Sequence, residues 1–125
     1  MLKTIKVRVY IDYGADKGVR VKDVKIPQGS SILDALKAVA DVKYVESDAA
    51  SGHLGAVVLE IDGVKADLNM SWVFYIYDKK TRDWAFPQVT ADKVIVENGS
   101  IVLWRYYSHK EEGFPPKTRP RVEVY

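Results

Sequence analysis

Alternation of apolar and polar residues marks the first two strands of the predicted fold. Over residues 5–11 every second residue is apolar, which is typical of a half-buried strand. Residues 12–18 are rich in turn formers, and residues 19–26 resume an extended pattern whose inward parity changes between Val21 and Val24. The pattern therefore predicts a β-hairpin with a bulge in its second strand.

One amphipathic helix follows this hairpin. The Ser31 hydroxyl is placed to cap free backbone amides, and Asp34 stands at the third helical position, as in a capping box. Apolar residues then recur at helical spacing from Ile32 to Ala40. Burying each large apolar side chain contributes on the order of 1.5–3 kcal/mol, so this helix face is expected to pack on the sheet.

Further strands are predicted in the second half of the chain. Residues 56–61 form a short strand closed by a turn at Asp62 and Gly63. Residues 71–77 are apolar or aromatic on both faces, as in a central strand that is covered on both sides. Because a single helix covers only one face, the other face is expected to be covered by the chain's own ends, by a second copy or by a ligand.

The clearest hairpin signal is Asn98-Gly99, because this pair tolerates the positive φ of a tight turn. It predicts that residues 94–97 and 101–107 pair with each other. Residues 108–125 form a charged, proline-rich tail whose last five residues alternate as in a short edge strand. The predicted fold is α+β, with a β-grasp-like mixed sheet over residues 1–107 packed on one main helix.

Two segments lack regular patterning and are interpreted as loops, residues 41–55 and residues 79–92. The second loop carries Trp84 and Phe86, which no strand face obliges to be buried. Exposed aromatic side chains of this kind indicate a ligand or partner surface. The strand aromatics predicted to belong to the core are Trp72, Phe74 and Trp104.

Composition narrows the classes of function. The 125 residues fit one domain, and 47% apolar with 29% charged residues is typical of a globular protein. The net charge of +2 is spread along the chain, so no nucleic-acid partner is expected. No stretch approaches the roughly 20 apolar residues that a bilayer helix needs, so no membrane partner is expected either. The sequence has no cysteine, which excludes disulfides and thiolate nucleophiles. The first residues hold no apolar signal core, which predicts a cytoplasmic protein, or a secreted one if a signal peptide has been removed.

Candidate catalytic groups are few. No glycine-rich phosphate loop occurs, and the two histidines, His53 and His109, lie outside any nucleophile motif. Glu60 and Asp62 share a strand face, which suits paired carboxylates or cation ligands. The same spacing also describes an ordinary solvent-exposed face that ends in a turn. A loop histidine such as His53 is usually solvated, and an axial metal ligand is the sharper alternative because imidazole binds transition metals well. No enzymatic activity is predicted, and an enzyme that uses Glu60, Asp62 or His53 stays as a lesser alternative.

Four segments occur in an order that resembles a known family. They are SSILDALK, HLGAVVLEIDGV, WVFYIYD and VENGSIVLWRYY, and the resemblance spans residues 5–107. In this order they resemble the carboxyl-terminal β-domain of transcobalamin and intrinsic factor, and bacterial transcobalamin-like domains. The resemblance implies a β-grasp domain akin to the soluble-ligand-binding class. In the vitamin carriers this domain closes over one face of cobalamin, opposite a much larger helical domain.

The resemblance also implies ligand contacts from the loop after the helix and from the loop after the WVFYIYD-like strand. The ligand-binding residues carried over in this way are His53, Leu54, Tyr77, Trp84, Phe86 and Gln88. Aromatic edges and a glutamine amide suit the apolar rim and amide arms of a corrin, and an imidazole suits its cobalt.

The leading hypothesis is a non-enzymatic module that binds a small ligand, with cobalamin or a related tetrapyrrole as the candidate. The alternative is a protein-interaction or assembly module that forms a homodimer or docks a partner protein through its aromatic sheet face. A stable dimer that buries Trp84 and Phe86 would favour the alternative. A monomer with both side chains exposed in a pocket would favour the small ligand.

Overall fold

The computed structural model describes residues 3–14, 17–47, 55–120 and 122–124, and it shows one five-stranded and one three-stranded sheet. The strands are β1 (Thr4–Asp12), β2 (Val19–Pro27), β3 (Val42–Ser47), β4 (Gly55–Ile61), β5 (Val64–Lys65), β6 (Met70–Asp78), β7 (Asp83–Ala85) and β8 (Ile101–Ser108). The helices are α1 (Ile32–Val39), the short 3₁₀ helix η2 (Ala91–Lys93) and α2 (His109–Glu112).

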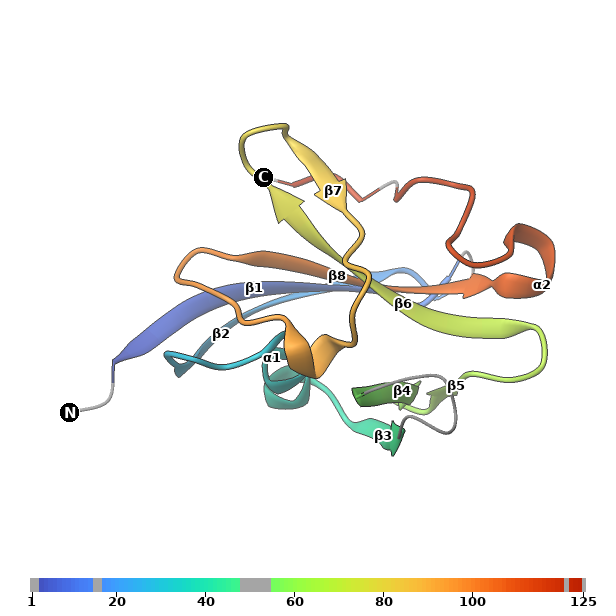
Figure 1. The fold of residues 1–125 in the computed structure, drawn as a ribbon, viewed down its shortest axis with the longest axis horizontal. Helices are drawn as coiled ribbons and strands as arrows, with labels where there is room; N and C mark the ends of the chain where they lie inside the picture. The colour runs from blue at the N-terminus through green and yellow to red at the C-terminus, as the bar shows by residue number, and fades with distance from the viewer. Residues whose placement is uncertain (1–2, 15–16, 48–54, 121, 125) are drawn as a thin grey trace.

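The larger sheet has the order β2-β1-β8-β6-β7 and is mixed, because β1 runs parallel to β8 while the other neighbours are antiparallel. The smaller sheet has the order β3-β4-β5. Helix α1 and the smaller sheet lie on the same side of the larger sheet, where they share one apolar core with it (Figure 1). The predicted α+β class is confirmed.

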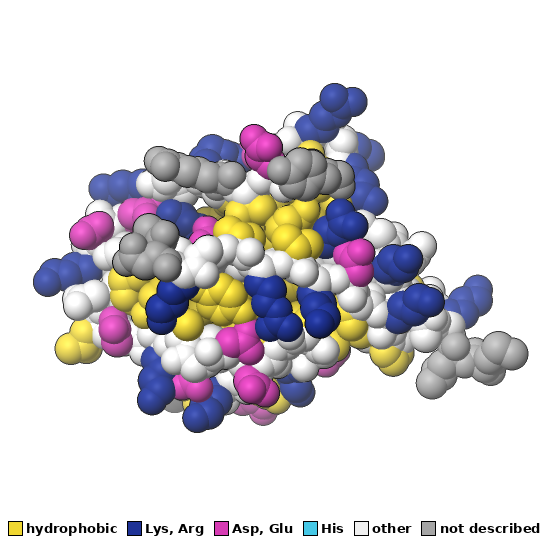
Figure 2. Space-filling model, turned by 180° about the vertical axis from the view of Figure 1, so that it is seen from behind, with side chains coloured by type: hydrophobic (Ala, Val, Ile, Leu, Met, Phe, Trp, Pro, Cys, Tyr) yellow, Lys and Arg dark blue, Asp and Glu magenta, His cyan; other side chains and the backbone are white. Residues whose placement is uncertain are grey.

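The first hairpin forms without the predicted bulge. β1 and β2 pair without interruption from Thr4 opposite Pro27 to Asp12 opposite Val19, so the bulge prediction is wrong. The inward parity changes between Val21 and Val24 for another reason. β2 is an edge strand, and it carries apolar residues on both faces. Val19 and Val21, on the face away from α1, are 48% and 49% exposed. Figure 2 shows the molecule from behind the view of Figure 1, with hydrophobic side chains at the surface among charged ones.

Helix α1 begins as the sequence predicts. The Asp34 amide donates to Ser31 Oγ at 3.1 Å and the Ser31 amide donates to Asp34 Oδ2 at 2.9 Å, which completes the capping box. The buried residues of the helix are Ile32, Leu33, Ala35, Leu36 and Val39. Its apolar stripe therefore faces the sheet, which confirms that prediction.

The Asn98-Gly99 turn is present, but it does not join a hairpin. Residues 94–97 form no strand and run beside the start of α1, where the Val96 amide donates to the Ser30 carbonyl at 2.9 Å. The Gly99 amide donates to the Lys6 carbonyl at 2.8 Å, so the turn docks on β1. β8 then pairs with β1 and β6, and the hairpin prediction is wrong because these distant strands are the partners that β8 takes.

Both predicted loops contain strands. β3 pairs antiparallel with β4, and its alternation is hidden in the sequence by a register shift between Lys43 and Tyr44. β7 is only three residues long and pairs with the end of β6. The rest of the first predicted loop, residues 48–54, lies outside the described residues.

The chain's own C-terminal segment covers the sheet face opposite α1. After α2 the chain runs back across this face toward β7 (Figure 1). Val122 and Val124 pack there against an aromatic-rich cluster. The buried members of this cluster are Tyr10, Val73, Tyr75, Trp84, Leu103 and Tyr107. Of the three expected covers for this face, the structure shows the chain's own end.

The strand aromatics occupy the core on the α1 side, as predicted. Trp72 and Trp104 are buried there, and Phe74 is partly buried and packs against the same core. None of the helices in the described part of the chain is long and apolar enough to span a bilayer.

Candidate functional site

The predicted site residues that the structure describes gather around the β6–β7 hairpin. Tyr77 stands opposite Trp84 in the strand register, and their rings meet edge to face with centroids 5.3 Å apart. The rings of Phe86 and Tyr75 have centroids 5.5 Å apart. Gln88, two residues further along the chain, is exposed. His53 and Leu54, also predicted to bind the ligand, lie outside the described residues.

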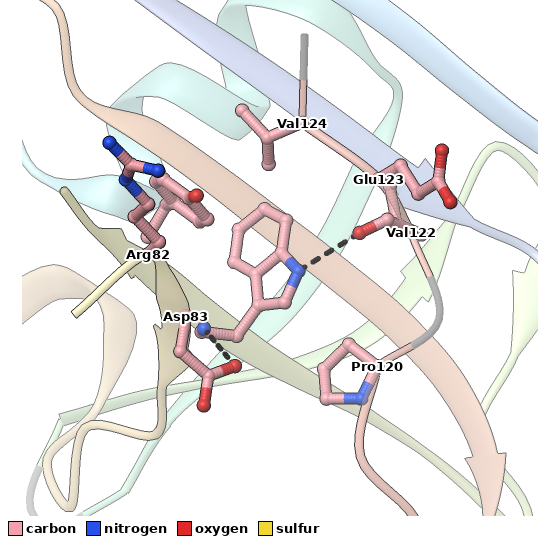
Figure 3. Close-up of a pocket in the computed structure, with 8 residues that line it drawn as sticks. Arg82, Asp83, Pro120, Val122, Glu123 and Val124 are labelled. Atoms are coloured by element: carbon pink, nitrogen blue, oxygen red, sulfur yellow. Dashed lines mark hydrogen bonds between the residues drawn. The ribbon is translucent and has the colours of Figure 1, made fainter.

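Trp84 is buried, with 8% of its surface exposed, and is not the exposed loop aromatic that the sequence predicts. It lies on a short strand, which turns its ring onto the sheet face against Tyr10 at 6.1 Å. The tail then closes over it, and the indole N–H donates to the Val122 carbonyl at 3.1 Å (Figure 3). Phe86 is half-buried and contacts Phe114 of the tail at 5.7 Å.

Side-chain contacts hold the tail in place at two points. Near its start, Arg105 pairs with Glu112 at 3.1 Å and donates to the Thr118 carbonyl at 3.0 Å. Near its end, the Arg119 guanidinium pairs with Asp83 and donates to the Trp84 carbonyl at 3.2 Å. Hydrogen bonds from Arg119 and from the Trp84 amide hold the pKa of Asp83 below its ordinary value, so this carboxylate stays ionised.

Two open hollows flank the β6–β7 hairpin, and Tyr77 lines both. The tail-side hollow, of about 390 Å³, lies between the hairpin and the tail (Figure 3). It is lined by Tyr77, Arg82, Asp83, Trp84, Pro120, Val122, Glu123 and Val124. The turn-side hollow, of about 530 Å³, lies between the hairpin and the turn that precedes β8. It is lined by Ile76, Tyr77, Asp78, Lys79, Lys80, Ala85, Glu97, Asn98, Gly99 and Ser100.

The turn-side hollow combines an apolar wall with charged and polar groups. Its turn is fixed by two bonds, because Asn98 Oδ1 accepts from the Lys6 amide at 2.9 Å and Ser100 Oγ accepts from the Glu97 amide at 2.8 Å. A side chain at Gly99 would meet Lys79 Nζ at 3.1 Å, so the glycine gives the ammonium group room. This arrangement can hold a molecule that has a flat apolar edge and oxygen-bearing arms.

Sequence reasoning missed the turn side of this hollow. The Lys79-Lys80 pair and the Asn98-Gly99 turn are both visible in the sequence. What brings them together is the antiparallel pairing of β6 with β8, which sets Ile76 opposite Val102. The sequence pattern was interpreted as a local hairpin in place of this long-range pairing. The lysine pair and the Asn98-Gly99 turn were therefore not predicted to lie together.

The candidate carboxylates do not converge. Glu60 pairs with Lys43 at 3.6 Å and Lys65 at 3.9 Å. Asp62 accepts from the Tyr13 hydroxyl, from Arg20 at 3.1 Å and from the Asp41 amide at 3.0 Å. Each carboxylate thus has its own set of partners. Within the described ranges, no group of three histidine or acidic residues could hold a metal ion.

His109 forms a pair that the sequence did not predict. Its Nε2 bonds to the Leu68 carbonyl at 2.8 Å, and because a carbonyl only accepts, Nε2 carries the proton in the neutral ring. Its Nδ1 therefore accepts from the Ser71 hydroxyl at 2.6 Å. The pair joins α2 to the start of β6, and it lines neither hollow.

Comparison with known proteins shows a shared fold. No family model matches the chain, and no curated protein matches its sequence. Haptocorrin, solved in complex with Cbi, is similar with a TM-score of 0.63 at 14% identity, over 86% of this chain. A proposed metal-binding protein from Ruminococcus gnavus is similar with a TM-score of 0.62 at 13% identity, over 83% of this chain and 97% of its own. The chain spans 26% of the haptocorrin chain, and at these identities the likeness extends to the fold alone.

Proposed function

We propose that this chain is a non-enzymatic module that binds a small ligand in the turn-side hollow, with cobalamin or a related tetrapyrrole as the candidate. The observation that carries the proposal is that the tail closes the aromatic face but leaves this hollow open. Its volume of about 530 Å³ falls within the range typical of small-molecule sites. The fold that the chain shares with haptocorrin, which was solved with Cbi, supports this class of ligand.

The chemistry of the hollow suits a macrocycle with polar arms. Ile76, Tyr77 and Ala85 line the hollow and offer apolar contacts to the rim of the ring. Lys79 and Lys80 offer ammonium groups that donate to amide carbonyls or carboxylates on its arms. Because the hollow is open and takes only one edge of such a ring, we expect binding in the micromolar range.

Titration of the purified protein with hydroxocobalamin tests this proposal. We expect a saturable change in corrin absorbance together with quenching of tryptophan fluorescence, since Trp84 contacts Tyr77 at the wall of the hollow. The double variant Lys79→Ala/Lys80→Ala is expected to weaken binding at least fivefold. Lys110→Ala, an exposed lysine on α2, is the matched control and is expected to bind as the wild type does. No spectral change at high micromolar ligand would refute the proposal.

The aromatic sheet face is a weaker candidate for the function. Docking of a second copy or a partner there requires Trp84 and Tyr75 to be accessible, and the tail cluster buries both. That face can be reached only when the tail leaves it.

A further inference from the structure

The end of the tail lies on the sheet face in the manner of a bound extended peptide. Val122 and Val124 pack into the aromatic cluster, while Glu123 between them is exposed. This in-out-in alternation is the pattern of an extended ligand that inserts every second side chain. Arg119 reaches back to Asp83, so the segment also has a charged anchor three residues before its first valine.

The sheet does not depend on this segment for its backbone hydrogen bonds. Among the described residues, 114–124 form no main-chain to main-chain hydrogen bond. The contacts run instead through side chains, from the Trp84 indole to the Val122 carbonyl and from Arg119 to Asp83 and the Trp84 carbonyl. The segment can therefore leave without breaking a strand pairing, which is typical of regions that open at low cost.

The surface beneath the segment has the features of a recognition groove. It offers an ionised carboxylate for a cation, an indole N–H for a backbone carbonyl, and aromatic walls for β-branched side chains. We call it the tail groove and define it by Tyr10, Tyr75, Tyr77, Asp83 and Trp84. Its tail-side hollow of about 390 Å³ is space that the tail does not fill. The exposed Val19 and Val21 continue the same sheet face, because Val21 stands opposite Tyr10.

We propose that the tail groove binds an extended peptide segment of a partner protein, in which a basic residue precedes two β-branched apolar residues by three and five positions. The chain's own C-terminal segment occupies the groove as an internal competitor. The spacing follows from Arg119, Val122 and Val124, whose contacts show what the groove accepts. The tail groove shares Tyr77 with the turn-side hollow, but Asp83 and Trp84 do not line that hollow, so the peptide and the small ligand are tested separately.

A fluorescent peptide with the sequence KTRPRVEVY, which copies residues 117–125, tests the proposal on the full-length chain. The variant Val122→Ser/Val124→Ser keeps the tail but removes its apolar anchors. We expect the peptide to bind this variant at least tenfold more tightly than the wild type, because the internal competitor is weakened. Adding Asp83→Ala is expected to reduce that binding at least fivefold. A peptide with serine in place of both valines is expected not to bind.

Controls separate the possible outcomes. If loss of both valines unfolds the chain, seen as loss of the tryptophan near-ultraviolet signal, Arg119→Ala is used instead and is expected to raise peptide affinity at least threefold. Equal affinity for wild type and variant, or no saturable binding to either, would overturn the proposal. A wild-type dimer of twice the chain mass by light scattering, dissociated by the peptide, would make a second copy the occupant and would overturn the assignment to a partner protein. Hydroxocobalamin titration of the same variants reports on the other site.

Discussion

At the scale of single residues, Trp72 and Trp104 form a natural comparison. Both indoles are buried in the core on the α1 side, on the paired strands β6 and β8. The Trp72 N–H donates to the Val64 carbonyl at 2.9 Å. The Trp104 N–H is buried with no hydrogen-bond partner in the described part of the chain. The two side chains therefore differ mainly in one buried hydrogen bond.

We expect Trp72→Phe to destabilise the protein more than Trp104→Phe. Both changes remove part of an aromatic side chain, but only the first leaves the Val64 carbonyl without its donor. An unsatisfied buried group costs about 1–3 kcal/mol, so the free energies of unfolding of the two variants should differ by about that amount. Urea denaturation followed by circular dichroism measures the difference, and equal losses in the two variants would contradict it.

Local signals also decided which residues could be predicted from the sequence. Ser31 and Asp34 were predictable because a capping box is complete within four residues. Trp84 was not, because its burial depends on β7, which is three residues long, and on the tail nearly forty residues further on. A strand of three residues is too short to show a detectable alternation of apolar and polar residues.

At the scale of elements, the sequence predicts that a strand or helix exists more readily than it predicts which strand it pairs with. β1, β4, β6, β8 and α1 were predictable because each carries its own apolar pattern. The partner of β8 was not, because its parallel pairing with β1 joins residues that are about ninety positions apart in the chain. An Asn-Gly turn reports that the chain bends there and carries no information about which strand the next segment will join.

Gly55 ties β4 to the loop around η2 and provides an element-scale prediction. Its φ is +127°, and a Cβ there would lie 1.9 Å from Thr90 Oγ1 and 2.7 Å from Asp92 Oδ1. The same Asp92 oxygen accepts from the Ala56 amide at 2.9 Å, so a displaced Asp92 loses that bond. Backbone strain of about 1–2 kcal/mol therefore adds to a clash and a lost hydrogen bond. We expect Gly55→Ala to lower the free energy of unfolding by about 3 kcal/mol or more.

Gly63→Ala is the matched control for this change. Gly63 also has a positive φ of +83°, but a Cβ at that position meets nothing within 4 Å. Its substitution carries the strain alone, about 1–2 kcal/mol. Thermal and urea denaturation of the two variants should rank Gly55→Ala as clearly the less stable, and similar losses would show that β4 and the η2 loop are not tightly coupled.

At the scale of the whole molecule, the family resemblance pointed to the loop after the WVFYIYD-like strand, which in the structure contains β7, but not to the tail that packs on it. The predicted Tyr77, Trp84 and Phe86 do lie close together. What the sequence could not show is that the tail folds back over them, because a proline-rich segment carries no periodic pattern that reveals its docking surface. The turn-side hollow depends likewise on the β6–β8 pairing and needed the fold to be recognised.

Two carboxylates join elements that are distant in the sequence. Asp62, after β4, bonds to Tyr13 and Arg20 near the first turn. Glu112 of α2 bonds to Arg105 of β8 and to the Thr118 amide of the tail. Burial pushes the pKa of each carboxyl up, but the hydrogen bonds and nearby guanidinium groups outweigh it, so both pKa values lie below the ordinary ones.

These lowered pKa values predict how stability depends on pH. A carboxyl whose pKa is lower in the folded state than in the unfolded chain stabilises the fold fully above the unfolded value, about 4, and this contribution is lost as pH falls through the folded value. We therefore expect the urea midpoint to be nearly constant from pH 7 to about 5 and to fall steeply below about 4. In Asp62→Asn/Glu112→Gln the midpoint at pH 7 should be lower and its fall in acid shallower, because two proton-binding groups are gone. If the urea midpoint of this variant fell below pH 4 as steeply as that of the wild type, other carboxylates would be the ones that hold these elements together.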